Sequence, residues 1–184
     1  LYGLAAFSDV GGRYLEMNDI PKAKAIMQQI NEETRLSLKE FRLFIHNLRP
    51  VELAEGGLAS ALEARLTSVE GRADIRTSLL VDPGFPRLPL KVEENLYYIA
   101  QEALNNTMRH SKASEVTISL QQVDGFVRMQ IQDNGVGFDP QAQKSGRYGL
   151  ENIRKRALTV GGNAEISSNP QQGTQISISV PHPN

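Results

Sequence analysis

A carboxylate and a carboxamide four residues apart, Glu102 and Asn106, are the residues whose types and spacing first suggest chemistry in this sequence. They lie in the segment 90–110, whose apolar residues recur at helical spacing, so their side chains are neighbours on one helix. Their oxygen atoms suit a hard cation, and Mg²⁺ in particular combines a few protein oxygens with water and phosphate. The pair alone fits the solvated flank of an ordinary helix at least as well.

Asp133 ends a predicted strand over 127–133 whose apolar residues fall on the odd numbers, which places this carboxylate on the buried face. A carboxylate there costs free energy unless a donor meets it. Gly135 and Gly137 follow, and glycines let the backbone turn sharply and approach a ligand closely. An inward-facing acceptor beside open backbone suits a heterocycle that carries an amino group, such as adenine, although this short pattern is often only a turn.

Two further glycines, Gly146 and Gly149, come just before or at the start of a helix predicted over 150–160. Backbone N–H groups at a helix start present a positive dipole end to phosphate, and a loop before an ordinary helix is the common alternative. Residues 139–148 separate this glycine pair from the preceding one and are expected to form a mobile lid over a ligand. Thr174, at the start of the last predicted strand, is uninformative by itself.

The length and composition of the chain limit the kind of fold that can position these residues. The chain has 184 residues, a formal charge of −1 and 40% hydrophobic residues, enough for one domain with a sizeable core or one domain and a smaller appendage. Near-neutral charge argues against non-specific binding to nucleic acid or a membrane surface as the main role. The absence of cysteine excludes disulfides and thiolate sites, and no apolar run approaches the roughly 20 residues of a membrane-spanning helix.

Residues 1–48 are predicted to be helical, with a short turn between a first helix, cut short at its start, and a long second one. Asp19 is expected to cap the second helix, with Pro21 in its first turn, and the proline after Arg49 ends it. Positions that alternate by four and three residues form a seam typical of a coiled coil or helical bundle: Ala23, Met27, Ile30, Thr34, Ser37, Phe41, Phe44 and Leu48. Because a hairpin alone buries only one side, we expect self-association into a four-helix bundle; an ordinary helix packed on its own domain is the alternative.

After Pro50 the pattern predicts a mixed domain of helices and strands. Strands are expected over 75–81, 116–120, 127–133, 164–166 and 176–180, and helices over 58–69, 90–110 and 150–160. A tight turn at residues 124–125 joins the second and third strands as a hairpin. The sum is an α+β fold, with a layer of helices on one face of a mostly antiparallel sheet.

The order of the motifs along the chain carries a resemblance that no single motif would. A helix with E-x-x-x-N is followed by D-x-G-x-G, by a glycine-rich helix start and by Gly-Thr. In this order the sequence resembles the ATP-binding domain of the GHKL superfamily, which includes gyrase, histidine kinases and MutL. Residues 102–110 look like its N box, 133–138 like its G1 box and 146–150 like its G2 box, and the resemblance covers roughly 56–181.

A finer resemblance, to sensor histidine kinases that pair with LuxR-type response regulators, rests on residues 101–113, on 148–157 and on the Leu-Arg-Pro at 48–50. It implies a dimerisation hairpin at 1–50, which is half of a dimeric four-helix bundle. It also implies a two-layer α/β sandwich of the Bergerat ATP-binding type at 51–184. With these motifs the resemblance extends over almost the whole chain.

The resemblance also implies ligands and roles for individual residues. The cofactors would be ATP and Mg²⁺, and the catalytic residues would be Asn106 as metal ligand, in preference to Asn105, and Glu102 acting through water. Asp133 would accept a hydrogen bond from the adenine amino group, with Thr174 behind the adenine. Further residues would bind the nucleotide, some near its phosphates and some by close approach: Arg109, His110 and Lys112, with Gly135, Gly137, Gly146, Gly149 and Leu150.

The chain contains three histidines, and none is expected to be a phosphoacceptor. In this subfamily the first bundle helix carries the acceptor histidine, followed by an acidic residue, and that box would lie before Leu1. His110 lies in the N box, His182 in the C-terminal tail, and His46 has no acidic neighbour. We therefore expect a catalytic-core fragment that binds MgATP without autophosphorylation. The intact parent would phosphorylate a bundle histidine and then a response-regulator aspartate.

The implied partners are a second copy of the chain, bound through residues 1–50, and a LuxR-type response regulator, with no direct contact of this fragment to nucleic acid or membrane. A cytoplasmic location is expected, also where the parent is an inner-membrane sensor. Three alternatives stay open: an anti-sigma-type serine protein kinase of the same superfamily, a non-catalytic dimerisation module with a vestigial nucleotide site, and an ATP hydrolase of the gyrase or MutL kind. The first lacks a hairpin ending in Leu-Arg-Pro, and the last usually needs a transducer domain for which the chain has no room.

Overall fold

The computed structural model describes the backbone of residues 10–46, 51–73, 75–139 and 147–182. Side chains are described for these residues with the exception of 35–46, 72–73 and 147. The chain divides into two compact units, Leu1–Arg49 and Pro50–Asn184, and each is described by itself. Within the described ranges, no helix combines the length and the apolar character needed to cross a membrane.

The N-terminal unit contains two helical segments, residues 10–16 and α2 (Ile20–His46), joined by a turn in which Asn18 has a φ of 55°. Asp19 caps α2, because its Oδ1 accepts a hydrogen bond from the Lys22 N–H at 3.3 Å. Its Oδ2 lies 2.9 Å from Lys22 Nζ in an exposed ion pair. The predicted cap, turn and start of the second helix are therefore confirmed.

The predicted seam of α2 is only partly covered within one chain. Ala23 is 4% exposed, whereas Met27 is 66% exposed. Gly11 of the first segment lies against Ile26, where an added Cβ would be 3.2 Å from Cγ2 of that side chain. The first segment therefore packs on α2 beside Ile26 and leaves Met27 open to solvent. Other predicted positions lie outside the described side chains: Ser37, Phe41, Phe44 and Leu48 of the seam, and residues 1–9 of the first helix.

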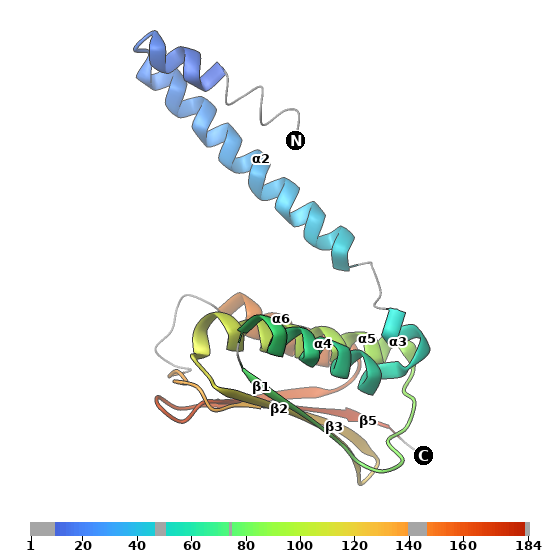
Figure 1. Cartoon of the computed structure of the whole chain (residues 1–184). Helices are drawn as coiled ribbons and strands as arrows, with labels where there is room; N and C mark the ends of the chain where they lie inside the picture. The colour runs from blue at the N-terminus through green and yellow to red at the C-terminus, as the bar shows by residue number, and fades with distance from the viewer. Residues whose placement is uncertain (1–9, 47–50, 74, 140–146, 183–184) are drawn as a thin grey trace. The chain divides into compact units, whose positions relative to one another are not determined.

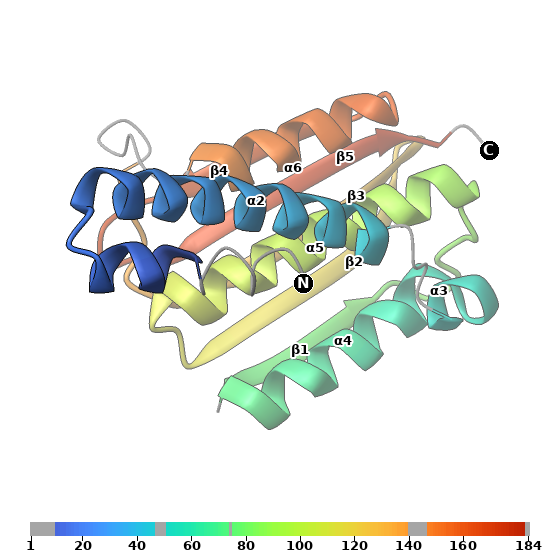
Figure 2. The ribbon, with the colours of Figure 1, turned by 90° about the horizontal axis from the view of Figure 1, so that it is seen from above.

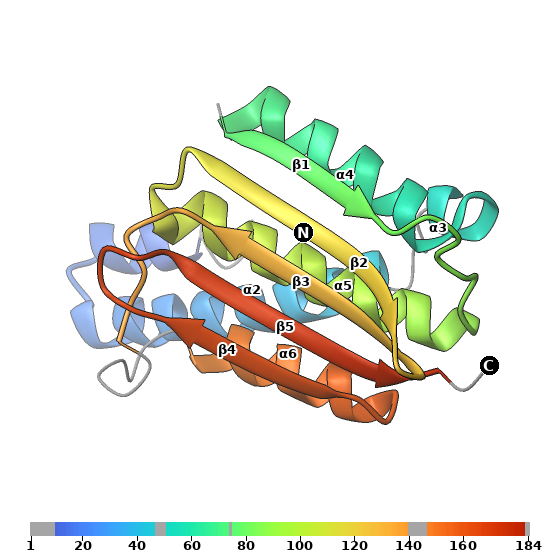
Figure 3. The same cartoon turned by 90° about the horizontal axis from the view of Figure 1, so that it is seen from below.

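The C-terminal unit is built on a five-stranded sheet with the strand order β1-β2-β3-β5-β4 (Figure 3). The strands are β1 (Arg76–Val81), β2 (Glu115–Val123), β3 (Phe126–Asp133), β4 (Asn163–Ser168) and β5 (Thr174–Pro181). β1 pairs parallel to β2 and the other three pairings are antiparallel, so the predicted mostly antiparallel sheet is confirmed. The register places Asp133 opposite Val116 of β2 on one side and Thr174 of β5 on the other.

The helices of this unit lie on one face of the sheet, as Figure 1 shows. They are α3 (Val51–Glu55), α4 (Gly57–Ala73), α5 (Leu90–Asn106) and α6 (Arg147–Thr159). Figure 2 shows α6 running beside α5 over β5 and β4. Along β3, Met129 and Ile131 are buried under the helices while Arg128 and Gln132 are exposed on the other face. This alternation produces the two-layer α/β sandwich that the sequence predicts.

The boundaries of three helices differ from the predicted ones. α4 extends beyond the predicted 58–69 at both ends, and α6 begins at Arg147 rather than at residue 150. The predicted helix over 90–110 is a regular α-helix only to Asn106 and continues as a π-helical turn, η1 (Thr107–Ser111). Hydrophobic periodicity does not distinguish these two kinds of turn. The bond from the Val136 N–H to the Ser111 carbonyl, at 2.7 Å, ties η1 to a distant loop and is a tertiary contact.

Candidate functional site

A cavity of about 510 Å³ lies between the helical layer and the sheet in the C-terminal unit, within the size range of small-molecule sites. The cavity is lined from α5, η1, β3 and the loop after it, α6 and β5: Ala103, Asn106, Thr107, His110, Ser111, Ile131, Asp133, Val136, Gly137, Phe138, Leu150, Thr174 and Ile176. Most of this wall is apolar, and a few polar side chains interrupt it. Such a wall suits a flat apolar ring that carries a small number of polar groups.

Asp133 is 8% exposed at the end of β3 and supplies the buried carboxylate of the cavity. Its Oδ1 accepts a hydrogen bond from the Gly135 N–H at 2.9 Å, and its Oδ2 accepts one from Thr107 Oγ1 at 3.2 Å. A carboxylate has about four acceptor positions. Within the described part of the chain no cation pairs with Asp133, so two neutral donors hold this charge and leave acceptor capacity toward the cavity.

The Thr107 hydroxyl is shared between two acceptors. Its Oγ1 lies 3.2 Å from the carbonyl oxygen of Ala103, one helical turn back, and 3.2 Å from Asp133 Oδ2. A hydroxyl has one proton, so it satisfies one of these acceptors at a time. The carboxylate of Asp133 is therefore incompletely satisfied by the protein itself, and a ligand donor can complete it.

The two glycines after Asp133 are needed for contacts within the protein. A Cβ at Gly135 would overlap the backbone of Ser111 at the end of η1. A Cβ at Gly137, whose φ is 58°, would overlap the Asn169 carbonyl between β4 and β5. The loop after β3 is thus clamped between η1 and the β4–β5 turn. The sequence prediction assigned both glycines to close approach of a ligand; Gly137 lines the cavity, and Gly135 is buried behind it.

Ser168 fixes the other side of this loop. Its Oγ accepts a hydrogen bond from the Phe138 N–H at 2.9 Å and donates to the Gly173 carbonyl at 2.9 Å. The same Oγ lies 3.0 Å from Thr174 Oγ1. These bonds hold Phe138 and Thr174, both of which line the cavity, next to the buried end of β4.

Asn105 and Asn106 have different surroundings although they are adjacent in sequence. Asn106 lines the cavity, whereas Asn105 Oδ1 accepts a hydrogen bond from Arg65 Nη2 of α4 at 2.9 Å. A Cβ at Gly149 of α6 would overlap Glu102 Oε1 and lie 3.5 Å from Asn106 Nδ2. The missing side chain at residue 149 therefore lets α6 lie against Glu102 and Asn106 of α5. Glu102 lies against α6 and is not among the residues that line the cavity.

Arg109 and His110 of η1 and Lys112, directly after it, are all exposed, and they differ in their relation to the cavity. His110 lines it, whereas Arg109 and Lys112 do not; Lys112 has a φ of 51° and ends the turn. The described residues contain no group of three or more His, Cys, Asp or Glu side chains that could hold a metal ion alone. Gly146, which the sequence prediction assigned to nucleotide binding, lies outside the described residues.

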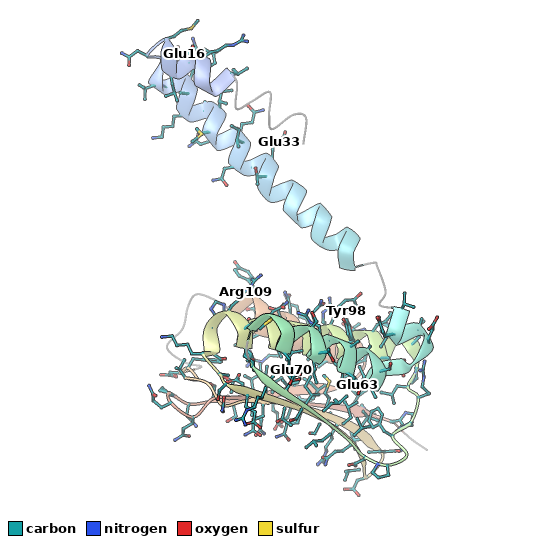
Figure 4. All side chains as sticks on the ribbon, in the orientation of Figure 1. Glu16, Glu33, Glu63, Glu70, Tyr98 and Arg109 are labelled. Carbon is teal, nitrogen blue, oxygen red and sulfur yellow. The ribbon has the colours of Figure 1, made fainter. Side chains whose placement is uncertain are left out.

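A second contact fixes α6 on α5 two turns away from Gly149. The Arg156 guanidinium lies 4.9 Å from the ring centre of Tyr98, and its Nη1 donates to Asn95 Oδ1 at 3.3 Å. Tyr98 lies on the side of the helical layer that faces away from the sheet (Figure 4). Burial lowers the pKa of Arg156, and the charges of Tyr98 and Glu102 oppose that shift. Arg156 and Gly149 together set the position of α6 along α5.

The structure brings part of the predicted site together in one cavity: Asn106, His110, Asp133, Gly137, Leu150 and Thr174. Sequence analysis missed the hydroxyl groups of Thr107 and Ser168, which organise the acid and the loop. Thr107 lies four residues after Ala103 on the buried face of the same helical segment, and this spacing is the signal that could have found it. Ser168 has no local signal, because its partners come from other segments of the chain.

This arrangement agrees with the comparison to known protein families. The sequence profile of the histidine kinase-, DNA gyrase B- and HSP90-like ATPases matches residues 91–184, which include α5, η1, the loop after β3, α6 and β5. The chain belongs to this ATPase family.

Individual relatives of this chain are named as sensor proteins. It is 37% identical over 177 residues to an uncharacterized sensor-like histidine kinase of Chloroflexus aurantiacus, covering 92% of this chain and 30% of that protein. It is 31% identical over 156 residues to the sensor protein VraS of Staphylococcus saprophyticus, covering 85% and 44%. The chain thus spans less than half the length of these curated relatives.

Solved structures support the same fold for this chain. The structure of full-length ShkA in complex with AMPPNP matches 87% of this chain and 39% of that one, with a TM-score of 0.61 and 20% sequence identity. At this identity the match shows a shared fold. The predicted histidine kinase-type ATP-binding sandwich is confirmed by the family match and by this fold.

Proposed function

We propose that this chain is the ATP-binding catalytic part of a sensor histidine kinase and that it binds MgATP in the cavity beneath η1. The whole protein would use it to phosphorylate a histidine of its helical bundle and then an aspartate of a response regulator. The observation that carries the proposal is the buried carboxylate of Asp133, which two neutral donors leave incompletely satisfied in the wall of the cavity.

The adenine ring is proposed to lie between Ile131, Ile176 and Leu150, with its amino group donating to Asp133. Adenine is flat and largely apolar, so these side chains supply the dispersion contacts that such a ring needs. Thr174 lies beside Asp133 in the β3–β5 register and is proposed to contact the same end of the base. A base without an exocyclic donor leaves the Asp133 oxygen unpaired, and this supports selectivity for adenine.

The Mg²⁺ ion is proposed to bind Asn106, with Glu102 acting through water. The residues fit this ion, because Mg²⁺ keeps several waters, uses phosphate oxygens and needs few protein ligands. Both side chains reach the point where Gly149 lies, and the described part of the chain offers no all-protein cage as a competing site. Bound there, the ion would neutralise the triphosphate charge. His110, Arg109 and Lys112 are proposed to orient the phosphates from η1, and Gly146 and Gly149 to let them approach α6.

The N-terminal unit is proposed to be a dimerisation hairpin, over residues 1–50, of a dimeric four-helix bundle. The exposure of Met27 on the predicted seam of α2 supports this, since a second copy would cover it. A LuxR-type response regulator is proposed as the partner that receives the phosphoryl group. We propose a cytoplasmic location for these residues, whether or not the parent is a membrane sensor, and no direct binding to nucleic acid or membrane.

None of the three histidines of this chain is proposed to accept the phosphoryl group. His110 lines the nucleotide cavity, and His182 is tied to the β2–β3 turn by the bond from its N–H to the Gly125 carbonyl at 2.8 Å. His46 has no acidic neighbour that could serve as a base. Incubation with radiolabelled ATP is expected to leave this chain unlabelled.

The experiment that tests the proposed function is calorimetric titration with a non-hydrolysable ATP analogue, with and without Mg²⁺. Binding that Mg²⁺ strengthens is expected for the unchanged chain. Asn106→Ala should reduce the Mg²⁺-dependent part of the affinity by about tenfold or more. Asn105→Ala removes the same group one residue earlier, where it bonds Arg65 outside the cavity, and should leave the Mg²⁺ effect in place.

No binding at millimolar analogue would reject the nucleotide site in this chain. The non-catalytic dimerisation module would then be the better explanation. Equal loss of the Mg²⁺ effect in both asparagine variants would reject Asn106 as the ligand while leaving the nucleotide site standing.

A further inference from the structure

Asn134 lies between Asp133 and Gly135 in the loop after β3. Both the oxygen and the nitrogen of its side-chain amide form hydrogen bonds with one distant segment, residues 114–115. Its Oδ1 accepts hydrogen bonds from the N–H groups of Ser114 and Glu115, each at 3.0 Å. Its Nδ2 donates to Ser114 Oγ at 3.0 Å. Its own backbone N–H donates to the Glu115 carbonyl at 3.3 Å. Four bonds therefore join this one residue to Ser114 and Glu115, where the connection from η1 enters β2.

The connection that Asn134 holds begins at η1, which carries one wall of the cavity. Ser111 ends η1, and its carbonyl accepts the Val136 N–H at 2.7 Å. Ser111 Oγ donates to the Thr107 carbonyl at 2.8 Å and accepts from the Ala113 N–H at 3.0 Å. Moving the connection would therefore move Ser111, and with it His110, relative to the loop that carries the acid. Figure 3 shows that β2 starts beside the end of β3, where these segments meet.

We propose that Asn134 is a positioning residue that holds η1 at a fixed distance from Asp133 and thereby sets the nucleotide affinity of the cavity. The side chain does not line the cavity, so it acts through the segment that it holds. One wall, on β3, carries the acid proposed for adenine, and the other, on η1, carries the basic residues proposed for the phosphates. A nucleotide that spans both walls binds well only if their separation matches its length. This inference rests on the proposed function.

The solvent exposure of the Asn134 bonds separates its effect on the position of η1 from its effect on stability. All three side-chain bonds of Asn134 are exposed to solvent, so water can replace each of them when the side chain is removed. The free energy of unfolding should therefore change little in Asn134→Ala. Water does not fix the direction of the Ser114 and Glu115 N–H groups, however, so the connection becomes free to shift.

The first test measures amide hydrogen exchange in the full chain without ligand, by NMR. In Asn134→Ala the Val136 amide should exchange about tenfold faster, because its acceptor Ser111 loses its anchor. The Asn134 side chain bonds Ser114 and Glu115 and not Val136, so the Val136 amide reports the shift of η1. The Met129 amide, in the middle of β3, should be unchanged and reports global opening. Unchanged exchange at Val136 would overturn the proposal, whatever the nucleotide result.

The second test measures the dissociation constant for the non-hydrolysable ATP analogue in the same variants. Asn134→Ala should bind about fivefold more weakly. Asn134→Asp keeps two acceptor oxygens for the Ser114 and Glu115 N–H groups, and Ser114 Oγ can then donate, so affinity should return to within about twofold of the unchanged chain. Gln132→Ala, on the exposed face of β3, is the matched control and should bind normally.

These two tests distinguish the positioning role of Asn134 from the proposed binding of nucleotide. Faster exchange at Val136 with an unchanged dissociation constant would overturn the positioning role, and so would an Asn134→Asp variant as weak as Asn134→Ala. If the unchanged chain binds no nucleotide, the proposed function fails, and the exchange at Val136 alone decides whether Asn134 holds the two walls together.

Discussion

Replacing Asp133 by asparagine changes one oxygen of the cavity acid to an NH₂ group and leaves its shape intact. The Gly135 N–H, at 2.9 Å from Oδ1, needs an acceptor, so the remaining carbonyl oxygen should take that position. The new NH₂ then takes the place of Oδ2, next to Thr107 Oγ1. Thr107 can accept from it, because the hydroxyl proton has the Ala103 carbonyl at 3.2 Å as its other partner. The protein itself therefore satisfies the substitution.

The consequences for folding and for binding should differ in size. Since every buried polar group keeps a partner, the free energy of unfolding should change by no more than about 1 kcal/mol. An adenine amino group, by contrast, would meet a donor in place of a charged acceptor. Loss of a hydrogen bond to a charged group is worth about 1.5–3 kcal/mol, which corresponds to about tenfold to a hundredfold weaker binding.

The assay is a double cycle measured by calorimetry, with two non-hydrolysable triphosphates that differ only in the 6-amino group of the purine. The unchanged chain should prefer the amino-bearing analogue, and Asp133→Asn should bind both analogues equally. Asp124→Asn makes the same chemical change in the exposed β2–β3 turn, where φ is 52° and asparagine is well tolerated, and should keep the preference. An equal loss of affinity for both analogues in Asp133→Asn would refute the contact between Asp133 and the amino group.

Three further predictions concern the two units and two glycines. Deleting residues 1–49 should leave nucleotide affinity unchanged and convert a dimer to a monomer in sedimentation; a dimer that persists would reject the bundle. Gly149→Ala forces a Cβ against the flexible end of Glu102, so the Mg²⁺-dependent part of nucleotide affinity should fall about threefold to tenfold in calorimetry while the fold is kept. An unchanged Mg²⁺ effect would show that Glu102 is not needed there. Gly71→Ala meets no atom within 4 Å in the last turn of α4 and should raise the free energy of unfolding in urea by about 0.5–1 kcal/mol; a decrease would show strain in that helix.

Short-range pattern was enough to predict the burial of the acid and the start of α2. The odd-numbered positions of β3 face the helices because successive side chains of a strand alternate, so Asp133 had to follow Ile131 inward. Asp19 caps α2 because a short polar side chain at that position reaches an N–H three residues on. Both inferences need only residues a few positions apart, and the structure confirms both.

Other features of the site depend on which segments meet across the fold. Asn105 and Asn106 are equivalent in composition, and only the packing of α4 against α5 gives the first of them Arg65 as a partner. Glycine at 149 is explained by the side chain of Glu102, which belongs to another helix. No spacing within the sequence identifies such a pair.

The sequence by itself determined most of the elements, the inward face of β3, the order of the motifs and, through that order, the resemblance to the ATPase family. These follow from local periodicity and from residue types. The tertiary structure alone decided that η1 is a π-helical turn, that Thr107 shares its proton between Ala103 and Asp133, and that Asn134 holds the connection to β2. These depend on distances between distant segments, which are fixed only when the helical layer packs on the sheet.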